Sequence, residues 1–177
     1  MRRSILFALL LAILVAACSE ERSAVVPMPL DRARKILSKT ELPPVFGSNA
    51  PGVEMLNRPT EITWIVRNDG SEFMRYIATL SDAGEGRTRI VLELKGAKAG
   101  RAGNVEQRFA ENPSIRNLYL VAMEERIASA IEGRSLDMTK IYPALGVAMA
   151  ANLGNLRKSL DESAKASEEL DRGQKRR

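Results

Sequence analysis

The sequence predicts an α+β domain: a small antiparallel β-meander of three to four strands, covered by a long helix and followed by a helical C-terminal extension. Two observations predict this arrangement. Apolar residues alternate with other residues over 61–67, 73–80 and 88–95, with turn sequences between the runs, as in strands that bury one face. A broad apolar stripe with helical spacing follows Asn112-Pro113, and a helix of that length, about 29 Å, can lie across such a sheet.

The segment before the strands is expected to hold one short helix. Leu30, Ala33 and Leu37 recur at helical spacing, which predicts a helix from Leu30 to Lys39. Residues 43–60 carry four prolines and two glycines. They are therefore expected to form mainly loop, with a short strand over Val53–Leu56 as the alternative.

The three strands are separated by turn sequences and share a consistent inward face. Asp69-Gly70 supplies the positive φ angles that a tight hairpin needs, and a looser turn spans 82–86. Alternation along the strands predicts the inward residues, which are Ile62, Trp64, Val66, Met74, Tyr76, Ala78, Leu80, Ile90, Leu92 and Leu94.

The covering helix has clear start and stop signals. Asn112 suits the N-cap position and Pro113 the first helical position, while Gly133 suits the C-terminal end. The glycine-rich segment 96–103 indicates a flexible connection into a helix that starts at Asn104, with an anion site as the alternative.

The N-terminus carries the features of an export signal. Two arginines precede an apolar stretch of thirteen residues from Ile5 to Ala17, which predicts a secretory signal peptide over residues 1–17. An uncleaved anchor is one alternative, although a helix needs roughly 20 apolar residues to span a bilayer. Ordinary secretion is the other.

Residues Val15, Ala16, Ala17 and Cys18 resemble the lipobox of bacterial lipoproteins. The resemblance implies that Cys18 is acylated, becomes the mature N-terminus and holds the protein in a membrane through its fatty chains. Ser19, by the same resemblance and for a Gram-negative source, implies the outer membrane, with the protein facing the periplasm. Residues 18–29 are then expected to form a tether that leads to a domain over 30–135.

The residue inventory argues against catalysis. The 177 residues include no histidine and a single cysteine, which removes the commonest general base and the usual zinc ligands. The formal net charge is +5, but the charges are scattered along the chain rather than gathered in one stripe. Glu124 and Glu125 are expected to be surface or rim charges of the covering helix. We therefore expect a non-enzymatic protein with no cofactor, no metal and no nucleic-acid partner.

The order of elements over about residues 60–132 resembles the helix-grip fold of polyketide-cyclase and START-related proteins. The resemblance rests on late strands, a tryptophan in the first of them and a long closing helix; that family usually has more strands than are predicted here. It implies a small hydrophobic ligand held between the sheet and helix 112–132. The candidate ligand contacts are Trp64, Tyr76, Tyr119 and Met123. A core role for Trp64 is the alternative.

Residues 136–177 are predicted to form the helical extension and a charged tail. Large apolar residues run at spacings of 4, 4, 3 and 4 along its first part, which predicts one apolar seam. The seam consists of Leu145, Met149, Leu153, Leu156 and Leu160. Such a seam suits packing on the domain, on a second copy of the chain or on an envelope protein.

Two functions follow. The first is a lipid-anchored cell-envelope protein with a structural or interaction role. The alternative is a carrier or sensor of a small hydrophobic ligand. A sheet closed tightly by Met74, Ile90, Tyr119 and Met123 favours the first function, whereas an enclosed cavity lined by these residues favours the second.

Overall fold

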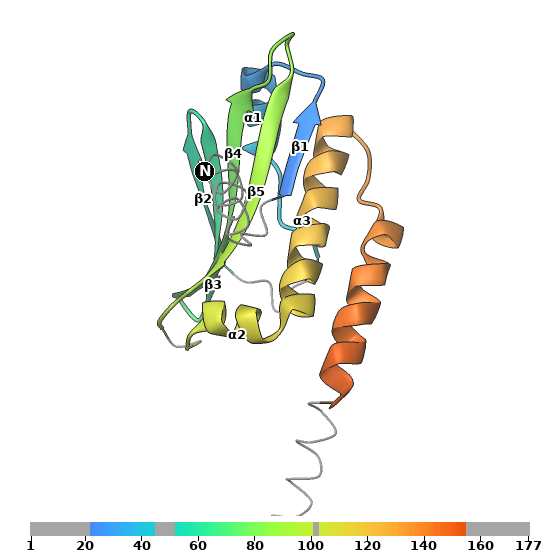
Figure 1. Cartoon of the computed structure of the whole chain (residues 1–177). Helices are drawn as coiled ribbons and strands as arrows, with labels where there is room; N and C mark the ends of the chain where they lie inside the picture. The colour runs from blue at the N-terminus through green and yellow to red at the C-terminus, as the bar shows by residue number, and fades with distance from the viewer. Residues whose placement is uncertain (1–21, 45–51, 101–102, 155–177) are drawn as a thin grey trace, which may run out of the picture.

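The computed structural model describes residues 22–44, 52–100 and 103–154. It is an α+β domain built on a five-stranded antiparallel sheet with the strand order β1-β5-β4-β3-β2 (Figure 1). The elements are β1 (Arg22–Val26), α1 (Leu30–Leu37), β2 (Gly52–Arg58), β3 (Glu61–Asn68), β4 (Ser71–Asp82), β5 (Thr88–Gly96), α2 (Val105–Glu111), α3 (Pro113–Glu132) and the 3-10 helix η1 (Met138–Lys140). A further helix, here called the C-terminal helix, occupies residues 142–154.

The predicted meander is confirmed as the centre of the sheet. β3, β4 and β5 pair antiparallel in sequence order, and all ten predicted inward residues are buried. Asp69 and Gly70 both have positive φ, as the predicted tight turn between β3 and β4 requires.

The predicted number of strands, three to four, is too low. One edge strand, β1, was not predicted, and the other, β2, is longer than predicted. β1 lies inside the segment 18–29 that was predicted as a tether, and β2 extends the short strand suggested over Val53–Leu56. Most side chains of both strands are exposed, so neither strand carries a clear apolar alternation. The tether prediction is wrong for residues Arg22–Val26, which pair with β5.

Helices α1, α2 and α3 pack on the inward face of the sheet. One core cluster joins the inward sheet residues with Leu37 of α1, Phe109 of α2 and Met123 of α3. The predicted ends of the covering helix are confirmed: α3 begins at Pro113 and ends before Gly133, whose φ is 66°.

The connection from β5 to α2 is closely packed. A Cβ atom at Gly96 would lie 2.5 Å from the backbone nitrogen of Glu106, so glycine is needed there for steric reasons. The Gly96 backbone amide donates to the Glu106 carboxylate. Asn104 Oδ1 caps α2 by accepting a hydrogen bond from the backbone amide of Gln107 at 2.9 Å. The described residues on both sides of this connection are therefore closely packed and capped, and the anion site stays a prediction.

The C-terminal helix packs on a second face of α3 and runs back alongside it (Figure 1). A second cluster joins Leu118 and Ala122 of α3 with Ile141, Ala144 and Ala148. α3 is thus covered on two sides, which fits a helix that is apolar around most of its circumference. In the described ranges, no helix combines the length and the apolar character needed to cross a membrane.

Candidate functional site

A groove of about 560 Å³ lies between β1, β5 and the C-terminal half of α3; we call it the β1–α3 groove. Its volume is within the range of sites for small ligands. The apolar lining consists of Ala24, Val25, Val26, Pro27, Met28, Ile90, Leu92, Ile127, Ala128 and Ile131. The polar lining consists of Arg22, Ser23, Glu124 and Glu132.

Strand pairing explains why β1 contributes to this groove. Ala24 lies opposite Ile90 in the β1–β5 register, and cross-strand partners point to the same face of a sheet. Ala24 therefore faces the helix side, where Ala128 of α3 also lines the groove. Both alanine side chains are short, so a space remains here between the strand and the helix. At other positions, larger core side chains fill the space between the sheet and α3.

The end of β1 is fastened by a buried hydrogen bond. The Thr88 hydroxyl donates to the Met28 carbonyl at 2.8 Å, and the Met28 amide donates to the Val26 carbonyl at 2.9 Å. Met28 is 8 % exposed. These contacts fix the chain as it leaves β1 for α1, so this wall of the groove is firmly placed.

The other end of the groove is polar. Arg22 lies opposite Leu92 in the sheet, and its guanidinium donates to the carboxylate of Glu124 and to the side-chain oxygen of Asn117, both on α3. The side chains of Arg22 and Glu124 are 31 % and 38 % exposed, so the pair contributes at most about 1 kcal/mol to stability. The arrangement combines apolar walls with one charged end, as a site for an amphiphilic molecule needs.

The four ligand contacts predicted from the sequence lie in the core instead of on this groove. Trp64, Tyr76 and Met123 are fully buried and Tyr119 is half-buried, and all four belong to or pack against the same core cluster. Met74 and Ile90 of the sheet are also buried, at 0 % and 3 % exposure, and belong to the same cluster. A ligand role for Trp64, Tyr76, Tyr119 and Met123 stays a prediction. The sheet is closed at this position, whereas Ile90 also lines the β1–α3 groove, where space for a ligand remains.

The polar atoms of these aromatic residues have partners within the domain. Trp64 Nε1 donates to the Thr40 carbonyl at 2.9 Å, and the Tyr76 hydroxyl donates to the Tyr119 carbonyl at 3.1 Å. Burial raises the pKa of Tyr76 well above its usual value of 10.0 and also raises that of Tyr119. The rings of Phe109 and Tyr119 meet edge to face at 5.9 Å, so the site around Tyr76 is a packed, neutral interior.

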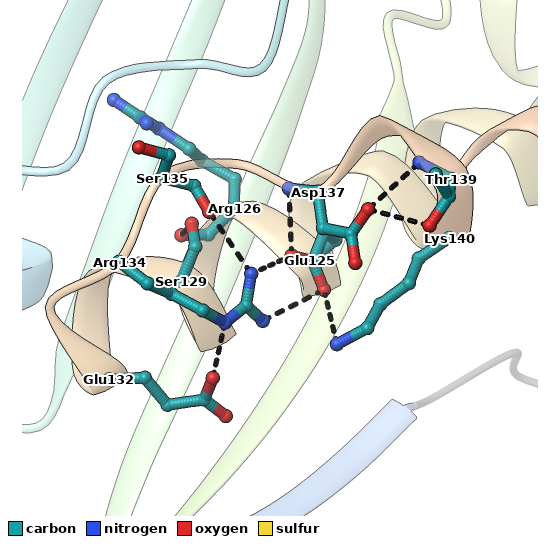
Figure 2. A network of polar contacts seen from close by, with 9 residues as sticks. All are labelled: Glu125, Arg126, Ser129, Glu132, Arg134, Ser135, Asp137, Thr139 and Lys140. Carbon is teal, nitrogen blue, oxygen red and sulfur yellow. Dashed lines mark hydrogen bonds and ion pairs between the residues drawn. The ribbon is translucent and has the colours of Figure 1, made fainter.

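A polar network fastens the segment after α3 to the helix itself (Figure 2). The carboxylate of Glu125 accepts hydrogen bonds from the Arg134 guanidinium and from the Asp137 amide, the latter at 3.1 Å. Lys140 Nζ lies 3.2 Å from the same carboxylate, and Arg134 also pairs with Glu132. The network thereby holds the start of the C-terminal extension against α3.

The environment of Glu125 explains its charge state. The hydrogen bonds from Arg134, with smaller effects of Asp137 and Lys140, lower its pKa from 4.5 to about 2 despite its burial. The prediction that Glu125 is a surface or rim charge is wrong, since the residue is 5 % exposed. A carboxylate that is fully ionised and fully paired is suited to fastening two segments rather than to accepting a proton.

In the described part of the chain, the predicted apolar seam packs on the domain only at Leu145, which lies against the second cluster. Leu145 is half-buried, whereas Met149 and Leu153 are 62 % and 54 % exposed. The buried residues of this contact are Ala144 and Ala148, on another face of the same helix. Leu156 and Leu160 lie outside the described residues, as do the signal peptide predicted over 1–17 and Cys18.

The groove could not be predicted from the sequence, because β1 was not predicted as a strand. Ile127 and Ile131 lie on the predicted covering helix, but Arg22, Ala24 and Met28 lie in the segment 18–29 that is predicted as a tether. The alternation of Arg22, Ala24 and Val26 on one face is too short and too weakly apolar to indicate a strand by itself. Over the described ranges, no three histidine, cysteine, aspartate or glutamate side chains gather closely enough to hold a metal ion.

Comparisons with known proteins give limited results. No family model matches the chain, and no curated protein matches it. Among solved structures, the chain is similar to CalU16 from Micromonospora echinospora, with 11 % identity, a TM-score of 0.33 and coverage of 73 % of this chain and 87 % of that one.

Two further structures show a similar level of likeness. One is a START superfamily protein from Mycobacterium smegmatis, with 15 % identity, a TM-score of 0.25 and coverage of 64 % of this chain and 93 % of that one. The other is the Polyketide_cyc-like protein Cgl2372 from Corynebacterium glutamicum, with 10 % identity, a TM-score of 0.25 and coverage of 70 % and 86 %. Likenesses at these TM-scores define neither family nor function.

Proposed function

We propose that this protein is a lipid-anchored cell-envelope protein that binds a small hydrophobic ligand in the β1–α3 groove and is not an enzyme. The observation that carries the proposal is the groove itself, an apolar space of about 560 Å³ between the sheet and α3. Burial of apolar ligand surface against its walls supplies the affinity, at roughly 25 cal/mol per Å².

The shape of the site favours an amphiphile over a wholly apolar molecule. Apolar walls run along β1 and α3, while Arg22 and Glu124 stand at one end with both side chains partly exposed. A ligand with a hydrocarbon part and a polar head satisfies both regions. The envelope location rests on the lipobox-like residues that end at Cys18, four residues before Arg22 in the sequence.

A fluorescent long-chain fatty acid, cis-parinaric acid, tests the groove directly when it is titrated into the chain from Ser19 to Arg177. We expect saturable binding, and we expect Ala128→Phe to weaken it by roughly tenfold or more because the ring occupies the space between strand and helix. Ala151→Phe is the matched control, since Ala151 is exposed on the C-terminal helix. Equal binding by both variants would contradict the proposed site.

A second variant that fills the same groove from the other side tests whether lost binding reflects unfolding. Ala24→Phe adds the ring from β1 instead of α3, and Ala24 is exposed, so its backbone and core neighbours need not move. Loss of binding in both groove variants, with thermal midpoints close to that of the wild type, would separate occupation of the groove from unfolding.

A second function, association through the C-terminal helix, is favoured by a separate observation. Tyr142, Met149 and Leu153 are each more than half exposed, and they recur on one side of the helix at intervals of seven and four residues. We propose that this side, extended in the sequence by Leu156 and Leu160, contacts a second copy of the chain.

A further inference from the structure

A basic stripe runs along α1, away from the β1–α3 groove. Arg32, Lys35 and Lys39 recur at i, i+3 and i+7, the spacing of one helix face, and all three are exposed. With Arg126 of α3, they line a shallow hollow of about 830 Å³. We call Arg32, Lys35 and Lys39 the α1 stripe.

The α1 stripe is not neutralised by the domain. Within the described ranges, none of its three side chains makes an ion pair. Asp31, the one acidic residue of the hollow's lining, lies 3.9 Å from Arg34 instead. Arg126 is the exception among the lining cations, because it lies 3.8 Å from the exposed Glu41 carboxylate.

The outer face of the sheet shows the opposite pattern. Several of its cations pair with nearby carboxylates, in Arg67–Glu54 at 2.6 Å, Arg75–Glu72 at 2.6 Å and Lys95–Glu93 at 2.7 Å. The scattered charge expected from the sequence describes the sheet. On α1, however, positive charge without a partner is concentrated on one face.

The opposite face of α1 fixes the stripe in place. Ala33 and Leu37 are completely buried in the core, and the Thr40 carbonyl just after the helix accepts the hydrogen bond from Trp64. α1 therefore cannot rotate to bring its cations toward a partner in the domain. The stripe is presented to whatever lies outside the molecule.

We propose that the α1 stripe docks on a bilayer surface that contains anionic phospholipid. Charge complementarity is the first argument: each lysine or arginine near such a surface adds about 1 kcal/mol of attraction, so three add on the order of 100-fold in binding.

The length of chain before β1 is the second argument, and it rests on the proposed anchor. Only residues 19–21 separate Cys18 from Arg22, and a fully extended chain spans at most about 14 Å over that interval. An anchored domain then stays against the membrane and must present one of its faces to it. The face whose cations make no ion pair within the described residues is the one that a negatively charged surface favours.

Vesicle flotation of the acyl-free chain from Ser19 to Arg177 tests the stripe independently of both Cys18 and the groove. We expect binding to vesicles of phosphatidylcholine mixed with phosphatidylglycerol, little binding to pure phosphatidylcholine, and weakening at high salt. Arg32→Gln/Lys35→Gln/Lys39→Gln should lower binding on the order of 100-fold. Arg89→Gln/Lys98→Gln/Arg108→Gln removes the same charge from exposed positions elsewhere and should leave binding largely intact.

Three outcomes would overturn the inference. They are no binding by the wild type to the anionic vesicles, equal losses in the two triple variants, and binding of an acidic protein by the stripe without any binding to vesicles. Failure of the groove proposal would look different. The fatty acid would then not bind saturably, or Ala128→Phe would not weaken its binding, while vesicle flotation would be unaffected.

Amine labelling of the lipidated full chain in proteoliposomes supplies the second readout. Lys35 and Lys39 should react more slowly with a water-soluble reagent when phosphatidylglycerol is present, while Lys98, exposed after β5, should react at an unchanged rate. Unchanged labelling of all three lysines would contradict docking by this face.

Discussion

At the scale of single residues, Glu125 shows how distant parts of the chain decide the role of a side chain. It is 5 % exposed yet ionised, because Arg134, Lys140 and the Asp137 amide surround its carboxylate. Its partners all follow α3 in the sequence. Removing the carboxylate would leave these donors without their acceptor and release the start of the extension.

We therefore expect Glu125→Gln to lower the free energy of unfolding at neutral pH by about 2 kcal/mol, the order of a hydrogen bond to a charged group. Its pKa is lowered in the folded state, so the stabilisation is fully present above the ordinary pKa of 4.5 and is lost as pH falls toward about 2. Urea unfolding of both proteins across this range measures the difference.

Glu124→Gln is the neighbouring control. Its pair with Arg22 is partly exposed, so the change should cost less than about 1 kcal/mol at neutral pH. A Glu125→Gln protein as stable as the wild type at neutral pH, or a stability difference that persists unchanged near pH 2, would contradict the account of the network.

At the scale of elements, the central strands could be predicted from sequence and the edges could not. Trp64, Tyr76 and Leu92 alternate with outward residues because β3, β4 and β5 each bury one face. β1 is an edge strand whose Ala24 and Val25 are exposed, so burial leaves little pattern in its sequence.

The candidate groove could not be predicted for the same reason. Its space depends on where Ala24 of β1 stands relative to Ala128 of α3, and the sequence contains no local signal for that pairing. Aromatic residues often line ligand sites, which made Trp64 and Tyr119 candidates; the structure places Trp64 in the core and Tyr119 against it, and their ligand role stays a prediction. The start and end of α3 were predictable, because Pro113 and Gly133 act through local backbone geometry.

The exposed side of the C-terminal helix gives a prediction at this scale. Met149→Glu/Leu153→Glu should abolish self-association by placing two charges on the seam, without unfolding the domain, since both side chains are more than half exposed. Sedimentation velocity over a range of concentrations measures the change. A wild-type chain that stays monomeric at every concentration would contradict association through this side.

Val147→Glu/Ala151→Glu is the matched control for that experiment. Both residues are exposed on the same helix, but the helical spacing directs them away from the side that holds Met149 and Leu153. This double variant adds the same charge and should associate as the wild type does. Equal dissociation of both double variants would assign the effect to net charge instead of the seam.

At the scale of the whole molecule, the proposed membrane anchor, the proposed ligand groove and the α1 stripe belong to one small protein. Because β1 begins at Arg22, the chain available between anchor and domain is much shorter than the tether predicted over 18–29. A ligand that enters the groove would then do so close to the membrane, where amphiphiles are abundant.

The anchor itself is tested by Cys18→Ala in the native host. We expect the wild type to incorporate labelled palmitate and to sediment with the membranes, and the variant to lose the label and appear in the periplasmic extract. The reason is that acyl chains on Cys18 would be the main attachment, with the α1 stripe contributing a weaker and salt-sensitive one. An unlabelled wild-type protein would contradict lipidation.

The most direct test of the central claim is native mass spectrometry of the chain from Ser19 to Arg177, purified from a bacterial periplasm without detergent. The account predicts a reproducible extra mass that leaves on denaturation, is absent from Ala128→Phe and is retained by Ala151→Phe. A wild-type chain that carries no extra mass, or an Ala128→Phe chain that carries it undiminished, would contradict ligand binding in the β1–α3 groove.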